Sequence, residues 1–332
     1  MDSNKKYNNP LTATLTGISS LFKKGERAGV LSENDRLEGK KVLITGSSSG
    51  LGLATAKQIA RLGGEVIMAV RSGIPEKGEE VKKESGSHKV SMNYVDLSDF
   101  DSIINFVSEI KEQHDKIDVV ICNAGMVASK ARKTKSGLEE MFMVNYLSTY
   151  FLIRLLLKEQ VLNMSGPDLP RIVIVNSESH RDPKEFNWAD FGKFKPYTMG
   201  KTVQLYGYYK LLLATFASEL SRRLNKEKVT HSVFVLCPGP VNSNIAREAP
   251  SVFKPLLSVV FRIFFRSPLK ASEPVVYLSA SKDVEAKDLD YLFLMQRKEM
   301  DAKAMDETNG KKLWDISQDL IKEVNSNYSS IL

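Results

Sequence analysis

The chain has 332 residues, 42% of them hydrophobic, which is enough to bury a large core in one or two domains. Two cysteines are too few for a disulfide framework, and the four histidines are scattered without metal-ligand spacing, so we expect neither disulfides nor a metal site. The net charge of +7 is spread over short mixed clusters, which disfavours nucleic-acid binding. No apolar run reaches roughly 18 residues, and the N-terminus is polar. We therefore expect no spanning helix and no signal peptide, and a cytoplasmic location.

The first 38 residues are polar and irregular, and we expect residues 1–38 to form an N-terminal arm. After residue 40, apolar runs of strand length alternate with longer segments of helical period. The runs are rich in Val, Ile and Leu with little alternation, which is typical of parallel strands buried on both faces. The pattern predicts an α/β fold, a Rossmann-type doubly wound parallel sheet in a single domain over residues 39–325, with C-terminal substrate-binding helices and a tail at 326–332. The predicted strands are 42–45, 65–70, 90–95, 119–122, 171–175 and 232–236, with 291–295 as an additional edge strand.

A glycine-rich turn, Thr45-Gly46-Ser47-Ser48-Ser49-Gly50-Leu51-Gly52, follows the first predicted strand and precedes a helical segment over 53–62. Glycines in this place allow a tight turn and let backbone N–H groups approach a pyrophosphate at the helix N-terminus. Such a turn commonly only connects two elements, but its position between the first strand and a helix favours cofactor binding. The predicted cofactor-binding residues of this turn are Gly46, Ser48, Ser49, Gly50, Leu51 and Gly52.

The second and third predicted strands end at residues that would face the adenosine half of a dinucleotide. Arg71 follows the second strand, where a carboxylate would suit a free ribose 2′-hydroxyl and a cation suits a 2′-phosphate. We therefore expect NADP(H) in preference to NAD(H), unless Arg71 is only a solvated strand-end residue. Asp96 and Leu97 follow the third strand; Asp96 is placed either to bond the adenine edge or to cap a helix that starts near Ser98.

Lys210 follows Tyr206 by four positions, so a helix would place them on one face, one turn apart. Lowering a tyrosine pKa from about 10 to about 7 needs about 4 kcal/mol, and one ammonium about 5 Å away supplies roughly 3 kcal/mol at an effective dielectric constant of about 20. The pair suggests proton transfer to or from a substrate oxygen, with Ser177, just after the fifth strand, as a partner. A second pair of this spacing, Tyr197 and Lys201, lies beside a proline and a glycine and is expected to be a loop or the start of the helix.

With these pieces, the chain resembles the short-chain dehydrogenase/reductase family from about residue 40 to at least Ser243. Within the family it is most similar to the retinol dehydrogenase-like branch, through the sequences at 171–180, 219–224 and 312–314. One departure is Asn176, where the family usually has a serine. The shared motifs are the glycine turn, Asp96-Leu97, Asn123-Ala124-Gly125, Asn145, Ser177, Tyr206-x-x-x-Lys210 and Pro238-Gly239.

The resemblance implies a role for each catalytic position. Ser177 would bond the substrate oxygen, and Tyr206 would be the general acid or base. Lys210 would lower the tyrosine pKa and hold the nicotinamide ribose, and Asn145 would bind a water of the proton relay. Around the cofactor, Asn123, Ala124 and Gly125 would line the adenosine-ribose side, and Pro238, Gly239, Val241 and Ser243 would lie near the nicotinamide.

The substrate side is predicted less directly. Residues 244–285 occupy the family's variable substrate-binding segment, and the apolar, aromatic and basic stretch 252–265 is expected to cap the cleft over a hydrophobic small molecule. The alternative for this stretch is peripheral membrane contact. The insert at 180–199, with Phe186, Trp188, Phe191 and Phe194, is expected to form another rim of the cleft.

Three alternatives concern the oligomeric state and the function of the whole protein. In the family, the helix at 206–224 often pairs between subunits, which leaves a homodimer open. A non-catalytic nucleotide-binding scaffold would keep the fold and the cofactor, but it has no need of a Ser-Tyr-Lys-Asn set. A sugar-nucleotide epimerase or dehydratase also uses Tyr-x-x-x-Lys, but the glycine spacing and Asn123-Ala124-Gly125 favour the dehydrogenase branch.

Overall fold

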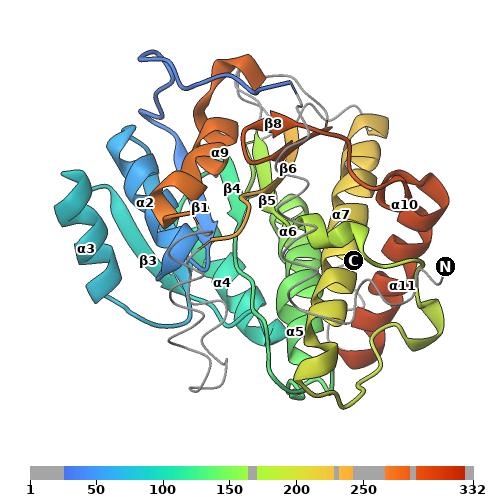
Figure 1. Ribbon diagram of the computed structural model, residues 1–332. Coiled ribbons are helices and arrows are strands. Elements are labelled where there is room, and N and C mark those ends of the chain that lie inside the picture. The colour runs from blue at the N-terminus through green and yellow to red at the C-terminus, as the bar shows by residue number, and fades with distance from the viewer. Residues whose placement is uncertain (1–25, 164–169, 228–231, 242–265, 285–288, 326–332) are drawn as a thin grey trace.

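The structure is a computed structural model that describes residues 26–163, 170–227, 232–241, 266–284 and 289–325 (Figure 1). Its centre is a sheet with the strand order β3-β2-β1-β4-β5-β6-β7-β8, in which neighbouring strands are parallel up to β7 and only the last pair is antiparallel. The strands are β1 Lys41–Thr45, β2 Glu65–Val70, β3 Val90–Tyr94, β4 Val119–Cys122, β5 Arg171–Val175, β6 Ser232–Cys237, β7 Leu289–Phe293 and β8 Gln296–Arg297.

Helices cover both faces of the sheet, as the doubly wound prediction requires. One face packs against α2 (Gly50–Arg61), α3 (Glu76–Ser85) and α9 (Pro268–Ala280). The other packs against α4 (Phe100–Gln113), α6 (Ser148–Lys158) and α7 (Met199–Lys226). Every residue of β4, β5 and β6 is buried, which explains why these strands are runs of Val, Ile and Leu without alternation. The predicted fold class is confirmed.

Two elements differ from the sequence-based expectation. The predicted edge strand is β7, which pairs with β6 on one side and β8 on the other, so the edge belongs to the two-residue β8. Helix α7 begins at Met199, well before the predicted start at Tyr206. Gly200 is accommodated in its first turn, where an added Cβ would meet no atom within 4 Å. Part of the predicted arm packs on the domain, since Ala28 and Leu37 are buried.

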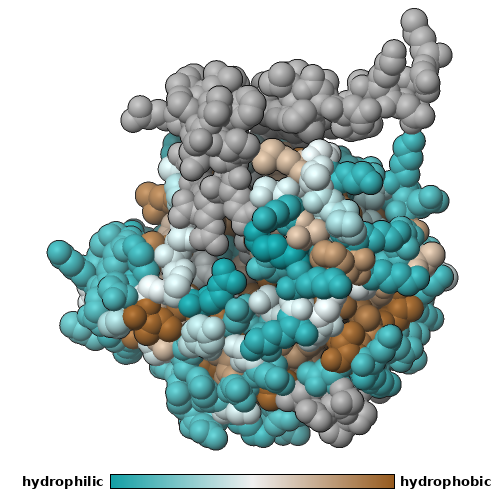
Figure 2. All heavy atoms as spheres, turned by 90° about the horizontal axis from the view of Figure 1, so that it is seen from below, coloured by the Kyte–Doolittle hydropathy of each residue, from teal (hydrophilic) through white to brown (hydrophobic). Residues whose placement is uncertain are grey.

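Several short elements lie between these strands and helices. They are α5 (Glu140–Phe142), a π-helical turn η2 (Met143–Leu147), and the 3₁₀ turns η3 (Glu178–Arg181), η4 (Trp188–Asp190) and η7 (Lys282–Val284). None of the helices in the described ranges is long and apolar enough to cross a membrane. On the face shown in Figure 2, apolar residues occur in separate areas among hydrophilic ones.

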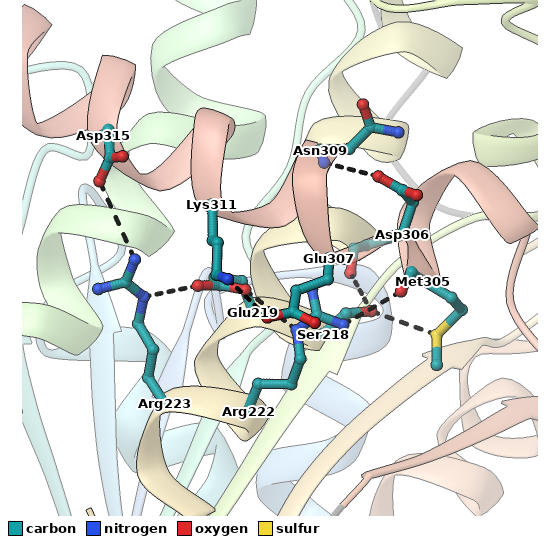
Figure 3. A network of polar contacts seen from close by, with 11 residues as sticks. Ser218, Glu219, Arg222, Arg223, Met305, Asp306, Glu307, Asn309, Lys311 and Asp315 are labelled. Atoms are coloured by element: carbon teal, nitrogen blue, oxygen red, sulfur yellow. Dashed lines mark hydrogen bonds and ion pairs between the residues drawn. The ribbon is translucent and has the colours of Figure 1, made fainter. Parts of the chain in front are cut away.

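Two C-terminal helices, α10 (Ala302–Met305) and α11 (Glu307–Val324), lie against α7 (Figure 3). The buried carboxylate of Glu219 on α7 accepts hydrogen bonds from Arg222 Nε at 3.0 Å and Arg223 Nε at 2.7 Å. Arg223 also lies over the ring of Trp314 on α11, 4.2 Å from its centroid. The helix that the resemblance expected to pair between subunits is therefore covered on this side by helices of the same chain.

The α11 helix also reaches α6 and the turn before it. The hydroxyls of Tyr146 and Ser317 are 2.6 Å apart, and the Tyr150 hydroxyl donates to the Trp314 carbonyl at 3.1 Å. The Arg154 guanidinium lies on Trp314 as well, 4.7 Å from its centroid. Buried hydroxyls with a partner and an indole contacted by two guanidinium groups fix α11 over the α6–α7 pair.

Candidate active site

A cleft of about 990 Å³ lies at the carboxyl ends of the parallel strands. This is the edge where an open α/β sheet binds its ligands, next to the change of strand order between β1 and β4. Asn145 does not line the cleft but lies behind it, and Ser243 is outside the described residues. The predicted residues that line the cleft together are Gly46, Ser48, Ser49, Gly50, Leu51, Gly52, Arg71, Asp96, Leu97, Asn123, Ala124, Gly125, Ser177, Tyr206, Lys210, Pro238, Gly239 and Val241.

The glycine turn leads from β1 directly into the N-terminus of α2. Gly46 and Gly50 have φ values of 66° and 53°, which favour glycine over residues with a Cβ. Gly52 has no room for a side chain, because a Cβ there would contact Gly46 O and Asn123 Nδ2. The first turn of α2 carries no acidic side chain, and Ser49 makes no side-chain cap. The N–H groups of this turn therefore remain suited to an anion.

The turn is held from the neighbouring strand. Asn123 Nδ2 donates to Thr45 O at 2.9 Å and to Gly46 O at 3.1 Å. Thr45 Oγ1 in turn accepts from the backbone N–H groups of Asn123 and Ala124 at 3.0 and 3.1 Å. Asn123 thus positions the glycine turn in addition to lining the cleft. The sequence analysis missed Thr45, although its place at the carboxyl end of β1, beside β4, was a usable signal.

Arg71 and Asp96 line the cleft together, at the carboxyl ends of β2 and β3. Their nearest charged atoms, Nη1 and Oδ1, are 3.8 Å apart, and the Arg71 side chain is 51% exposed, so its guanidinium remains accessible to a ligand. Asp96 Oδ1 accepts from the backbone and the hydroxyl of Ser98 at 2.9 and 2.7 Å. The alternative that Asp96 caps the helix is wrong, because α4 begins at Phe100 and Asp99 is its N-cap.

Ser177, Tyr206 and Lys210 form a compact group where β5 meets α7. The Ser177 and Tyr206 side chains both line the cleft, and Ser177 lowers the pKa of Tyr206. Ser177 Oγ accepts a hydrogen bond from the Ser179 hydroxyl at 2.9 Å. Lys210 Nζ lies 5.6 Å from the centroid of the Tyr206 ring and donates to Val175 O at 3.1 Å. The Lys210 side chain is buried because α7 packs on the end of β5. The four-residue spacing thus places Tyr206 and Lys210 on one face of α7, as expected from the sequence.

The acid-base balance of this group differs from the simple expectation. Burial lowers the pKa of Lys210 from 10.5 to about 8. Burial also raises the pKa of Tyr206 above its ordinary value of 10, and the Ser177 side chain offsets only part of this rise. The four-residue spacing from Lys210 therefore does not by itself make the tyrosine acidic in this structure.

Asn145 lies in the π-helical turn η2, a type of distortion that is frequent at functional sites. Its Nδ2 donates to Met126 O at 2.8 Å and Met141 O at 3.0 Å, and its Oδ1 accepts from Met126 N at 2.9 Å. A Cβ on Gly125 would lie 3.0 Å from Asn145 Oδ1 and 3.9 Å from Lys210 Nζ, so Gly125 separates the two side chains. Both amide donors of Asn145 are used, and its oxygen can accept one further bond.

The competing Tyr197 lies away from the cleft. Its hydroxyl donates to Glu139 Oε1 at 2.9 Å, and the residue is 8% exposed within the core. Lys201, its potential partner, is exposed on α7. The structure thus brings Ser177 together with Tyr206 and gives Tyr197 a packing role.

The substrate end of the cleft is less aromatic than expected. The insert contributes Arg181 and Asp182 to the lining, next to Ser179. The predicted rim of aromatic side chains is wrong, because Phe186 and Trp188 stack on each other at 4.4 Å and pack on the core cluster beside α7. The segment 252–265 lies outside the described residues. The apolar lining on this side consists of Met126, Val127, Val144, Val203 and Phe293.

The fold and the cleft are those of a dinucleotide-dependent oxidoreductase, and comparisons with known proteins agree. The family model described as short chain dehydrogenase matches residues 40–189. Retinol dehydrogenase 14 from Homo sapiens is 34% identical over 302 residues, which cover 86% of this chain and 87% of that protein. Retinol dehydrogenase 11 from Homo sapiens is 32% identical over 299 residues, covering 89% of each.

Solved structures show the same fold. The crystal structure of an uncharacterized protein from Mycobacterium paratuberculosis is similar with a TM-score of 0.67 and 27% identity, covering 89% of this chain and 98% of that one. The chain belongs to the short-chain dehydrogenase family, and its resemblance to the retinol dehydrogenase-like branch is confirmed. It is therefore related to oxidoreductases that use a nicotinamide cofactor on alcohol and carbonyl groups.

Proposed function

We propose that this protein is an NADP(H)-preferring oxidoreductase that interconverts the carbonyl and alcohol forms of a hydrophobic small molecule. The observation that carries the proposal is the group formed by Ser177, Tyr206 and, beneath the tyrosine ring, Lys210, at one end of a cleft whose other end holds the glycine turn and Arg71. The similarity to retinol dehydrogenases supports a retinoid-, steroid- or lipid-aldehyde-like substrate.

The residues of the cleft fit a nicotinamide dinucleotide. The side-chain-free surface at Gly52 and the uncapped N-terminus of α2 suit a pyrophosphate. The half-exposed guanidinium of Arg71 suits a ribose 2′-phosphate. When bound, the cofactor supplies or accepts the hydride.

Residues of the chain itself then carry out the proton transfer. Tyr206 gives a proton to the substrate oxygen in reduction and takes it back in oxidation, while Ser177 donates a hydrogen bond to the same oxygen. Lys210 places a positive charge under the tyrosine ring, and Asn145 holds the backbone at Met126 beside it. A cationic ligand ring against Tyr206 would add to the charge of Lys210 and offset the desolvation of the phenolate.

The test is a panel of aldehydes, ketones and alcohols, including retinoids and steroids, followed by NADPH absorbance with NADH as the control. Wild-type protein should turn over at least one apolar carbonyl, and Tyr206→Phe should lose about 100-fold or more in kcat with NADPH affinity nearly unchanged. Tyr206→Phe with wild-type turnover would transfer the acid role to another group.

A nucleotide-binding scaffold without turnover is the second candidate. It predicts NADPH binding by wild-type protein with no oxidation or reduction of any compound in the panel. The intact Ser-Tyr-Lys arrangement favours the enzyme.

We infer a cytoplasmic location for this protein; segment 252–265 lies outside the described residues. Co-sedimentation with anionic liposomes tests the alternative of peripheral membrane contact, since binding that disappears when 252–265 is made polar would assign the contact to this segment. The alternative of a homodimer is tested by sedimentation equilibrium, which measures the oligomeric state.

A further inference from the structure

His180 lies directly beneath the turn that carries Ser177, although it does not line the cleft. Its side chain is fully buried in the 3₁₀ turn η3. The ring atom Nδ1 is 2.7 Å from the Ser177 carbonyl oxygen, and the His180 backbone N–H donates to the same oxygen at 3.1 Å. The peptide of Ser177 is therefore held by one residue through two bonds.

The second ring nitrogen binds a distant part of the chain. Nε2 is 3.2 Å from the backbone nitrogen of Asp301, the N-cap of α10. A carbonyl can only accept and a backbone N–H can only donate, so Nδ1 must carry the proton and Nε2 must not. Only the neutral Nδ1–H form of His180 satisfies both partners.

The environment of the ring favours this neutral form. Burial lowers the pKa of His180 below its ordinary value of 6.5. The ring packs edge-on against Tyr291 of β7, with centroids 5.5 Å apart. The charged groups that face it are Arg181, Glu178 and Asp301, which act in opposite directions. A protonated ring would direct a second N–H at the Asp301 N–H and would break the contact.

We propose that His180 is a positioning residue for the reaction: it orients the Ser177 hydroxyl toward Tyr206, and the Asp301 N–H fixes the tautomer and orientation of its ring. The inference rests on the proposed function, because it assigns Ser177 to the substrate oxygen. Helix α10, whose N-cap is Asp301, packs on α7, the helix that carries Tyr206. The contact between His180 and Asp301 therefore sets the position of the turn that carries Ser177 relative to α7, which carries Tyr206.

Three substitutions of His180 distinguish the roles of its two ring contacts, one to Ser177 and one to Asp301. His180→Asn retains an amide donor near the Nδ1 position, His180→Gln retains an acceptor near the Nε2 position, and His180→Leu retains neither. If the bond to Ser177 controls catalysis, kcat should fall about 10- to 100-fold in the Leu and Gln variants and stay within about 3-fold of wild type in the Asn variant, with NADPH affinity unchanged. Equal losses in the Asn and Leu variants, or no loss in the Leu variant, would overturn the proposal.

His114 provides a control, since it is a half-buried histidine whose pKa is also lowered by burial, paired with Glu65 at the end of α4. His114→Leu should lower the melting temperature and leave kcat unchanged. If it lowers kcat as much as His180→Leu does, the effect is one of stability and the proposal fails.

A second pair of variants reports on the link even if His180→Leu fails to fold. Asp301→Pro removes the backbone N–H at a φ of −58°, which proline accepts, while Asp301→Ala removes only the side-chain cap. Asp301→Pro should have a lower kcat than Asp301→Ala. Equal kcat values would refute the role of the contact between His180 and the Asp301 N–H.

The tautomer can be read without any substrate. Nitrogen chemical shifts of the His180 ring at pH 7 should show the neutral Nδ1–H form, because burial lowers the pKa of His180 below 6.5. A charged or Nε2–H ring contradicts the inference. If wild-type protein turns over nothing in the panel, the proposed function fails while the ring measurement still decides this structural claim.

Discussion

Replacing Lys210 by methionine should stabilise the cofactor-free protein at neutral pH while it removes turnover. Methionine has a similar length and carries no charge, so it fills the same buried space. The pKa of Lys210 falls from 10.5 to about 8 because burial disfavours the ammonium, a difference of about 2.5. At about 1.4 kcal/mol for each pKa unit, the buried charge costs about 3 kcal/mol at pH 7.

The sign of the pH dependence follows from proton counting. Below about pH 8 the lysine is charged in both states, and the full cost is present. Between about pH 8 and 10.5 the unfolded chain binds more protons than the folded one, so the free energy of unfolding rises with pH in this window. The advantage of Lys210→Met should therefore shrink as the pH is raised from 7 to 10.

One contact reduces the expected gain. Val175 O loses the hydrogen bond that Lys210 Nζ donates at 3.1 Å, which costs about 1 kcal/mol. The net gain at pH 7 should be about 2 kcal/mol.

Urea denaturation of wild type and variant at pH 7.0 and pH 9.5, without cofactor, measures this difference. A variant that is less stable than wild type at pH 7, or a difference that does not change with pH, would refute the account of a strained buried ammonium. The kcat of the variant should fall by about 100-fold or more.

Three further predictions concern cofactor choice, the competing tyrosine and helix packing. Arg71→Asp should shift the ratio of kcat/KM for NADPH and NADH by about 10-fold or more toward NADH, because it replaces the cation at the ribose by a carboxylate; an unchanged ratio would reject the role of Arg71. Tyr197→Phe should leave kcat unchanged and lower stability by about 1 kcal/mol through the lost bond to Glu139, and a large drop in kcat would contradict its packing role. Gly310→Ala should destabilise by about 1–3 kcal/mol in urea, because its Cβ would lie 2.8 Å from Glu219 Oε2. The same substitution at Gly200, where an added Cβ meets no atom within 4 Å, is the matched control and should be neutral or stabilising, so equal losses at both positions would argue against the packing explanation.

The strands and the cleft could be predicted because their signals are local. Runs of Val, Ile and Leu mark strands buried on both faces, and β2, β4 and β5 have the predicted bounds. The glycine turn and the Tyr206–Lys210 spacing depend on neighbouring residues, and the parallel topology then brings them to one edge of the sheet.

Features that depend on distant partners could not be predicted. The role of His180 requires Asp301, which lies 121 positions further along the chain. The two-residue β8 has no periodic pattern, and it exists because the chain turns back after Phe293. The aromatic residues of the insert suggested a cleft rim, but they pack on the core because α7 begins early, at Met199, and the insert lies against it. The balance of pKa values also required burial, which sequence spacing does not give.

The position of α11 has a consequence for how this protein is made. The Tyr146–Ser317 contact joins residues 171 positions apart, so a growing polypeptide completes most of the sheet before Trp314 can reach Arg154 and Arg223. Until then the aromatic side chains of the α6–α7 pair are open to solvent and to chaperones. A premature stop codon before Glu307 would therefore act as an assembly defect, with loss of protein from the cell, even though it leaves Ser177, Tyr206 and Lys210 untouched.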